Sequence, residues 1–371
     1  MTSSNFDKDT DWFKKPFIYH ILIDRFAIDS ESSTYNHNSS DPTKPIFYGG
    51  NLRGIIEKLP YLKDLGISVL WLSPFYQNTE YHGYHITDYF KIDPHFGKID
   101  DLKELIKEAG KLEINVIADF VANHISKEHP FFVEATSDSN SEYVKWFKFA
   151  NWPAQYECYE NVTELPEFDL EYEPAADYMI GVAKFWIDIG LKGFRLDHAE
   201  GPPLSFWKKF NIEIKKTDPS VVLIGEVFEE KVQDYVGVLD GVIDFRFQNL
   251  AVRDVAQSKG VLEDSTEEFK KSLDEHYSKY PSDYLLVSFL DSHDRNRFLF
   301  ESGGDIEKLK AVLAVQFEQS MPKVIYNGTE RGVNQKQSIT SHNEHGDLEV
   351  RQPINWESKD EGLVGFVKGL S

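Results

Sequence analysis

The chain has 371 residues, a formal net charge of −22 and an isoelectric point near 5.0. A surface this acidic repels phosphate backbones and anionic lipid headgroups. We therefore expect neither nucleic acid nor a membrane as a partner. An uncharged substrate is compatible with such a surface. No apolar run approaches the length of a bilayer span, and the single cysteine, Cys158, excludes an intrachain disulfide.

The first residues of the chain indicate the cellular compartment that we expect for the protein. Residues 1–16 are polar and charged, without the apolar core or small-residue cleavage site of a secretory signal. The sequence as given therefore predicts a cytoplasmic protein.

Short apolar runs alternate with amphipathic segments along the chain. Strands are expected over 17–23, 67–72, 114–118, 193–196, 221–224, 242–245, 284–289 and 323–326, and the intervening helices over 52–65, 101–111, 175–189, 204–216, 266–279 and 306–319, with a last helical fragment near 362–369. Near-continuous Val, Ile and Leu strands separated by helices are typical of a buried parallel sheet. Eight such units favour a closed (β/α)8 barrel.

One long interval breaks this alternation. Residues 125–174, between the third strand and the third helix, are rich in Phe, Trp and Tyr. A connection of this length is usually a functional loop or an inserted subdomain. We therefore expect the catalytic (β/α)8 barrel over 1–124 and 175–371 and a short inserted subdomain over 125–174. Trp146, Trp152 and Tyr156 would form the small core of the insertion or line a binding site.

Acidic residues end or follow four of the predicted strands. Asp119 comes after the third strand, Asp197 after the fourth, Glu226 after the fifth and Asp294 after the seventh. In a barrel of this kind the reactive groups lie at the carboxyl ends of the strands. The acidic residues, with neighbouring His124, Arg195 and His293, should therefore meet at one rim.

Each residue alone has an ordinary explanation. Asp197 would serve as a helix N-cap, and Arg195, two residues earlier on the same side of a strand, would form an ion pair with it. Asp294 would cap a turn, and Glu226 would face solvent in a loop. The coincidence of all of them at four strand ends favours a functional site.

Four stretches carry a family resemblance: Asp119-Phe-Val-Ala-Asn-His124, Gly193-Phe-Arg-Leu-Asp197, Gly225-Glu226 and Phe289-Leu-Asp-Ser-His-Asp294. In content and order they resemble the α-amylase family of retaining α-glucan enzymes. The resemblance covers nearly the whole chain and implies a (β/α)8 barrel.

The resemblance also implies roles. Asp197 would be the nucleophile, kept ionised by Arg195, Glu226 the general acid and base, and Asp294 a carboxylate that supports the transition state. The remaining substrate-binding positions implied by the resemblance are Tyr84, His82, Asp119, His124 and His293, with Tyr81 as a plausible neighbour.

The chain departs from the family pattern in places. Ser292 stands where Asn is usual, His198 follows the nucleophile where family members often have a small or β-branched residue, and Glu200-Gly201 replace a Lys-His pair. Asn123 and Asp169 match family positions for calcium, but a Ca²⁺ site needs six to eight oxygen ligands. No cofactor is required on this interpretation, and Ca²⁺ remains an option. The insertion is shorter than usual, and the resemblance finds no C-terminal β-sandwich in this sequence.

The sequence thus predicts a retaining α-glycoside hydrolase acting on maltooligosaccharides or other α-linked glucans. A transglycosylase or α-glucosidase of the same family is the alternative, because water access and acceptor pockets depend on loops. A non-catalytic binding barrel is disfavoured, because all three carboxylates are present. Linkage preference, chain length and oligomeric state stay open.

Overall fold

Eight parallel strands close into a barrel in which each strand pairs with its neighbours, in the order β1-β12-β11-β10-β9-β8-β5-β2. The computed structural model describes residues 10–30, 45–341, 346–357 and 362–371. The strands are β1 (Phe17–Ile21), β2 (Val69–Leu72), β5 (Asn115–Phe120), β8 (Gly193–Leu196), β9 (Val222–Gly225), β10 (Gly241–Asp244), β11 (Leu285–Phe289) and β12 (Lys323–Tyr326). This confirms the predicted (β/α)8 barrel.

The barrel has two hydrophobic cores, because alternate residues of a strand point to opposite faces. On β2, Val69 and Trp71 belong to a cluster that fills the barrel interior. Leu70 and Leu72 belong to the larger cluster between the barrel and its helices. Strands that are buried on both faces explain why the sequence shows apolar runs rather than alternation.

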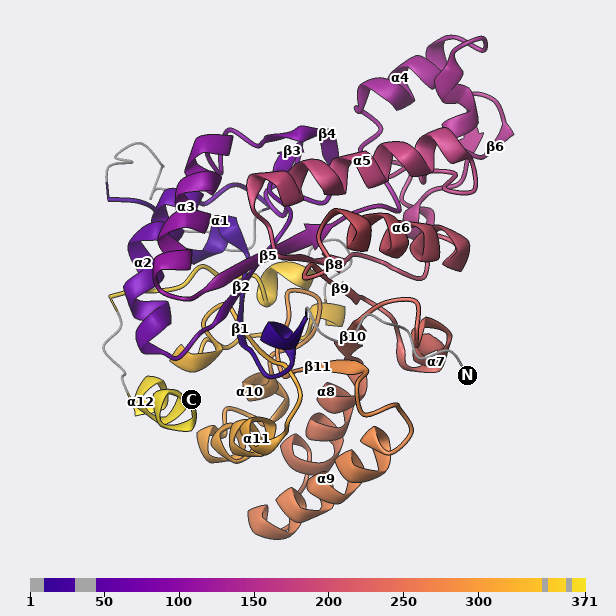
Figure 1. Cartoon of the computed structure of the whole chain (residues 1–371). Helices are drawn as coiled ribbons and strands as arrows, with labels where there is room; N and C mark the ends of the chain where they lie inside the picture. Colours follow the sequence, from indigo (N-terminus) through magenta and orange to yellow (C-terminus); the bar gives the residue numbers. More distant parts are fainter. Residues whose placement is uncertain (1–9, 31–44, 342–345, 358–361) are drawn as a thin grey trace.

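Helices surround the barrel (Figure 1). Those that pack outside it are α2 (Leu52–Asp64), α3 (Ile99–Lys111), α5 (Glu173–Ile189), α6 (Leu204–Thr217), α7 (Val232–Tyr235), α8 (Phe245–Ala251), α9 (Leu262–Tyr277), α11 (Ile306–Glu318) and α12 (Gly362–Leu370), with short α1 (Ile23–Phe26) and α10 (Phe298–Glu301) in connections. Local signals set several ends. The Asn51 side chain caps α2 by accepting the N–H of Gly54, and α5 ends at Gly190, whose φ is 124°.

The segment between β5 and α5 projects from the barrel at the upper right of Figure 1. It contains α4 (Pro130–Ser137), the short strands β6 (Phe149–Asn151) and β7 (Gln155–Tyr156), and 3₁₀ turns at Glu142–Trp146 and Tyr159–Asn161. Trp146 is buried, and the Tyr156 ring packs edge-on against Phe132. Trp152 remains 39% exposed. Two of the three aromatic residues therefore contribute to a core of the insertion.

The predicted elements differ from the structure in two connections. The hairpin β3 (Tyr76–Asn78) and β4 (Ile86–Ile92) was not predicted, because its residues alternate weakly and follow a Pro-containing stretch. Phe245, predicted as the end of a strand, instead begins α8, which continues into a π-helical turn at Val252–Ala256. Asp244 starts this helix by accepting the N–H of Phe247 at 3.0 Å.

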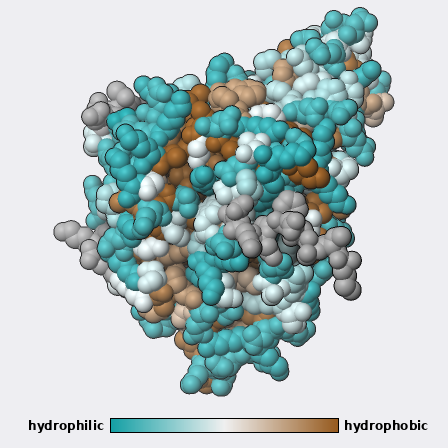
Figure 2. Space-filling model, viewed as in Figure 1, coloured by the Kyte–Doolittle hydropathy of each residue, from teal (hydrophilic) through white to brown (hydrophobic). Residues whose placement is uncertain are grey.

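Hydrophilic residues dominate the face seen in Figure 2, where hydrophobic residues gather in separate patches. Within the ranges that the structure describes, no helix combines the length and apolar character that a membrane span requires.

Tyr19 links the first and last barrel strands to a buried carboxylate. Its hydroxyl lies 3.1 Å from both carboxylate oxygens of Glu330 and accepts the N–H of Gly328 at 3.0 Å. We predict that Tyr19→Phe lowers the free energy of unfolding by about 1–3 kcal/mol, because it leaves buried polar groups unpaired. Urea denaturation measures the change, with Tyr172→Phe at a half-buried position as the control. An unchanged stability of Tyr19→Phe would contradict the assignment.

Candidate active site

A cavity of about 800 Å³ opens at the carboxyl ends of the barrel strands. Among the residues predicted from sequence, its lining includes the three carboxylates and four other side chains: Asp197, Glu226, Asp294, His82, Tyr84, His124 and His293. The other two predicted positions, Asp119 and Arg195, are fully or almost fully buried and contact this lining from within the barrel. All nine predicted residues therefore belong to one site.

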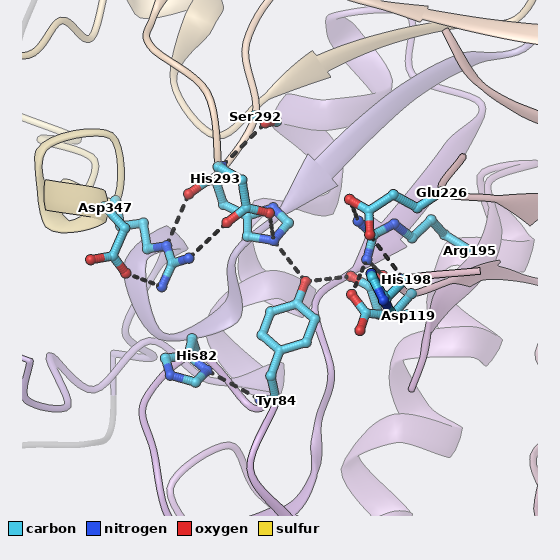
Figure 3. A network of polar contacts seen from close by, with 12 residues as sticks. His82, Tyr84, Asp119, Arg195, His198, Glu226, Ser292, His293 and Asp347 are labelled. Atoms are coloured by element: carbon cyan, nitrogen blue, oxygen red, sulfur yellow. Dashed lines mark hydrogen bonds and ion pairs between the residues drawn. The ribbon is translucent and has the colours of Figure 1, made fainter. Parts of the chain in front are cut away.

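Arg195 of β8 joins three carboxylates that come from or follow three different strands. Its Nη1 lies 2.6 Å from Asp119 Oδ1 and 2.7 Å from Asp197 Oδ1. Its Nη2 forms an ion pair with Glu226 Oε1. Asp197 and Glu226 thus bind the two terminal nitrogens of one planar guanidinium, which holds both carboxyl groups close to it. Figure 3 shows Glu226 next to Arg195.

Burial dominates the electrostatics of this group. It raises the pKa of Asp197 well above its ordinary value, and the Arg195 guanidinium opposes that rise while Glu226 adds to it. Burial likewise raises the pKa of Asp119, again against the effect of Arg195. The predicted ion pair between Arg195 and Asp197 is confirmed. Arg195 was expected to keep Asp197 ionised, and it does lower the pKa of this carboxyl, but burial and the carboxylates of Glu226, Asp119 and Asp294 outweigh its effect.

The backbone after β8 aligns the second carboxylate. His198 has a positive φ of 42°, and its N–H donates to Glu226 Oε2 at 2.9 Å. The N–H of Ala199 donates to the Glu226 carbonyl at 3.1 Å. A left-handed conformation at a non-glycine residue is costly and marks a position that its surroundings fix. Here the unusual turn directly after Asp197 provides a donor to Glu226.

Asp294 lies in a different electrostatic environment. His293 Nε2 lies 2.7 Å from its Oδ2, and Arg351 Nη2 lies 2.8 Å from its Oδ1. Burial would raise the pKa of Asp294, but His293 and then Arg351 outweigh it and hold the pKa well below the ordinary value. Its side chain is still 48% exposed, so an ionised carboxylate faces the cavity.

Tyr84 connects the two halves of the site. Its hydroxyl donates to Asp119 Oδ2 at 3.2 Å and lies 2.8 Å from His293 Nε2 (Figure 3). Its ring lies nearly parallel to that of His293, at 5.5 Å between centroids. The ring is therefore held in place by contacts at its hydroxyl end.

Two cavity histidines are uncharged at neutral pH. Burial, reinforced by His198, lowers the pKa of His124 to about 3, and burial lowers the pKa of His82 well below its usual range. Both ring nitrogens of His124 are buried without a hydrogen-bond partner in the described structure. A neutral imidazole both donates and accepts hydrogen bonds, so His124 is suited to a hydroxyl-bearing ligand.

Aromatic side chains form further parts of the cavity wall. Tyr159, from the insertion, packs between His124 and His198 at centroid distances of 4.7 and 4.8 Å. Phe228, two residues after Glu226 in the sequence, also lines the cavity. It is 45% exposed and packs on Phe245. Exposed aromatic faces next to hydrogen-bonding groups are typical of small-ligand sites.

Several cavity residues were not predicted from sequence. Arg351 and Asp347, which form an ion pair, lie far beyond the last recognised motif and reach Asp294 and Tyr81 only through the fold. Their spacing of four residues is the sole local signal, and it is common on surfaces. Tyr159 stood among many aromatic residues of the insertion, and none of the three named there lines the cavity.

The two candidate calcium residues have other contacts. Asn123 Nδ2 donates to Glu167 at 2.9 Å, and the Lys148 ammonium lies 3.9 Å from Asp169 Oδ1. No group of three or more His, Cys, Asp or Glu in the described ranges is arranged to hold a metal ion. A Ca²⁺ site takes six to eight oxygen ligands, to which Asn123 and Asp169 would contribute two side chains. Calcium at Asn123 and Asp169 stays a prediction.

Comparison with known proteins places the chain in a class. Residues 20–370 match the family described as Alpha amylase, catalytic domain, and the chain belongs to this family. It is 38% identical to Alpha-amylase 2 of Dictyoglomus thermophilum and 32% identical to a Cyclomaltodextrinase of Geobacillus thermopakistaniensis, each across 97% of this chain.

The match spans 63% of the first of these relatives and 62% of the second. Among solved structures, the type III pullulan hydrolase from Thermococcus kodakarensis superposes with a TM-score of 0.88 at 25% identity, covering 99% of this chain and 70% of that one. The barrel and its family are thereby established for this chain.

We predict that Arg351→Met raises the pKa of Asp294, because it removes a guanidinium that pairs with this carboxylate and lowers its pKa. A pH titration of the Asp294 carboxyl carbon by NMR measures the shift. Arg53→Met is the control, because Arg53 also pairs with two carboxylates, Asp101 and Glu104, outside the cavity lining. An Asp294 titration unchanged by Arg351→Met would contradict the role given to Arg351.

Proposed function

We propose that this protein is a retaining α-glycoside hydrolase that cleaves α-linked glucans or maltooligosaccharides. The observation that carries the proposal is the binding of Asp197 and Glu226 to adjacent nitrogens of Arg195, at the wall of a sugar-sized cavity. Retaining glycosidases need two carboxyl groups about 5–5.5 Å apart, and this arrangement is compatible with such a spacing. The relatives named Alpha-amylase 2 and Cyclomaltodextrinase support the substrate class.

In the first step an oxygen of Asp197 attacks the anomeric carbon of the bound sugar. The bond from that carbon to the glycosidic oxygen breaks, and the proton of the Glu226 carboxylic acid passes to the departing oxygen. The products are a glycosyl ester on Asp197, a free sugar end and the Glu226 carboxylate.

In the second step the Glu226 carboxylate takes a proton from water. The water oxygen bonds to the anomeric carbon as the bond to Asp197 breaks, which restores both side chains. Two inversions at one carbon give net retention of configuration.

The charges around the carboxyl groups bear on the roles proposed for Glu226 and Asp294. One guanidinium faces Asp119, Asp197 and Glu226, so the group carries excess negative charge and favours keeping one proton. The proposed mechanism requires this proton to be on Glu226, with Asp197 ionised, when the substrate is bound. Asp294 is held ionised by His293 and Arg351, and a fixed negative charge beside the sugar favours the positively charged transition state.

The remaining cavity residues would bind the sugar. Neutral His124 and His82 offer hydrogen bonds to hydroxyl groups, as does His293, and the fixed Tyr84 ring offers a face for the pyranose. Phe228, exposed two residues beyond Glu226, offers an apolar surface to the leaving sugar or to an acceptor. This apolar surface favours transglycosylation as a second activity, in which a sugar instead of water accepts the glycosyl group from the same intermediate.

Two other expectations remain predictions. An uncharged oligo- or polysaccharide is the proposed partner, and a cytoplasmic location is the proposed compartment. Cell fractionation with an antibody to this chain tests the location.

Product analysis tests the proposed function. We expect hydrolysis of at least one glucoside from a panel with α-1,4, α-1,6 and α-1,1 linkages, with the α-anomer released first, as chromatography and NMR detect. Asp197→Asn should lower turnover roughly 10⁴-fold or more while the protein remains folded. Asp188→Asn, on the exposed face of α5, is the matched control. Initial release of the β-anomer, or near-normal turnover by Asp197→Asn, would refute the mechanism.

Glu226→Gln tests the acid role separately. Substrates with sugar leaving groups need protonation, so their turnover should fall by about 10²- to 10⁴-fold. Aryl glycosides with good leaving groups should lose far less in the glycosylation step, which pre-steady-state release of the phenol measures. Glu171→Gln, at an exposed position, is the control. Equal losses on both substrate types would count against Glu226 as the acid.

A further inference from the structure

A second cavity, of about 310 Å³, lies beside the barrel wall at β9 and β10. The connection after β9 contains only a 3₁₀ turn at Glu229–Lys231 and the four-residue helix α7. By contrast, α2, α3, α5, α6, α9 and α11 have 13 to 17 residues each. The short helix leaves a hollow whose apolar wall includes Val232, Val242 and Leu286.

A buried carboxylate lines this cavity. Asp244 is 3% exposed, and its Oδ1 accepts both from His276 Nε2 at 2.9 Å and from the N–H of Phe247. Its Oδ2 is buried without a hydrogen-bond partner in the part of the chain that the structure describes. An unpaired buried acceptor costs free energy, so this oxygen is suited to accept a hydrogen bond from a ligand.

The rest of the lining favours a neutral ligand. Arg246 and Glu229 form an ion pair at 3.3 Å, and the lining also holds one further cation, Lys279, which pairs with Glu275 at 3.6 Å, and one further carboxylate, Asp244. Phe245 and Tyr280 contribute aromatic rings. Balanced charges, an unpaired acceptor and aromatic faces suit a polyhydroxylated molecule, and the volume lies at the small end of ligand cavities.

This cavity is distinct from the active site but shares a wall with it. Phe245 lines both the 310 Å³ cavity and the 800 Å³ cavity. Asp197, Glu226 and Asp294 line only the larger one of the two.

We propose that the cavity beside β9 and β10 is a second binding site, which accepts one neutral sugar ring with a hydroxyl group donating to Asp244 Oδ2. The site does not depend on the proposed hydrolysis, since none of the three proposed catalytic carboxylates lines it. If the hydrolysis is correct, glucose-sized products are a natural source of the ligand.

Methyl NMR of the full chain tests the proposal with glucose as the probe. We expect saturable shifts of the Val242 and Leu286 methyl signals, and these report on the second cavity. Val162 lines the larger cavity and reports separately on binding there. Val232→Phe, which fills the second cavity, should weaken the Val242 and Leu286 response at least tenfold. Val261→Phe, at a 65% exposed position, should leave it unchanged.

A second variant guards against misfolding. Asp244→Asn keeps an oxygen to cap α8 but removes the charge, and it should also weaken the response, whereas exposed Asp264→Asn should not. Glucose shifts confined to Val162, a Val242 response that Val232→Phe leaves intact, or tighter binding of anionic gluconate than of glucose would each overturn the proposal. A saturable Val242 response in a protein without glucan hydrolysis would refute only the proposed function.

Discussion

One buried guanidinium holds the site together. Arg195 is 3% exposed, and it forms ion pairs with Asp119, Asp197 and Glu226. Ions taken out of water lose hydration worth several kcal/mol each, and only close, well-oriented partners compensate for that loss. One cation cannot neutralise the negative charge of three surrounding carboxylates. The site therefore keeps a strong affinity for a proton or for a developing positive charge, and this is the property that glycoside cleavage needs.

The barrel makes this arrangement possible. On β8, Phe194 and Leu196 pack outward into the core beneath the helices, so Arg195 between them points into the barrel. There it meets Asp119, whose strand β5 pairs with β8 in register at Asp119 and Arg195. Strand pairing thus fixes the ion pair before any loop is considered. The loops after the strands then add Asp197, Glu226 and Asp294.

The two halves of the site have opposite electrostatic character. Around Asp197, burial and like charges raise the pKa, whereas around Asp294 the contacts with His293 and Arg351 lower it. Tyr84 contacts both halves through one hydroxyl. Environments that push carboxyl pKa values apart are the usual basis for giving similar groups different roles.

The eight-stranded barrel and the nine candidate site residues could be predicted from the sequence, the site residues with the help of the family resemblance. Apolar runs on strands buried on both faces are a local signal, and carboxylates at strand ends need only the rule that the carboxyl ends of parallel strands share one rim. The other features of the site could not be predicted, because they depend on contacts made only in the folded chain. Arg351, Tyr159 and Phe228 approach the cavity through loops whose paths no periodicity encodes. The charge state of Asp197 depends on burial, and the cavity at Asp244 depends on a helix only four residues long. Each of these properties arises from contacts between residues far apart in the chain, and local sequence does not specify such contacts.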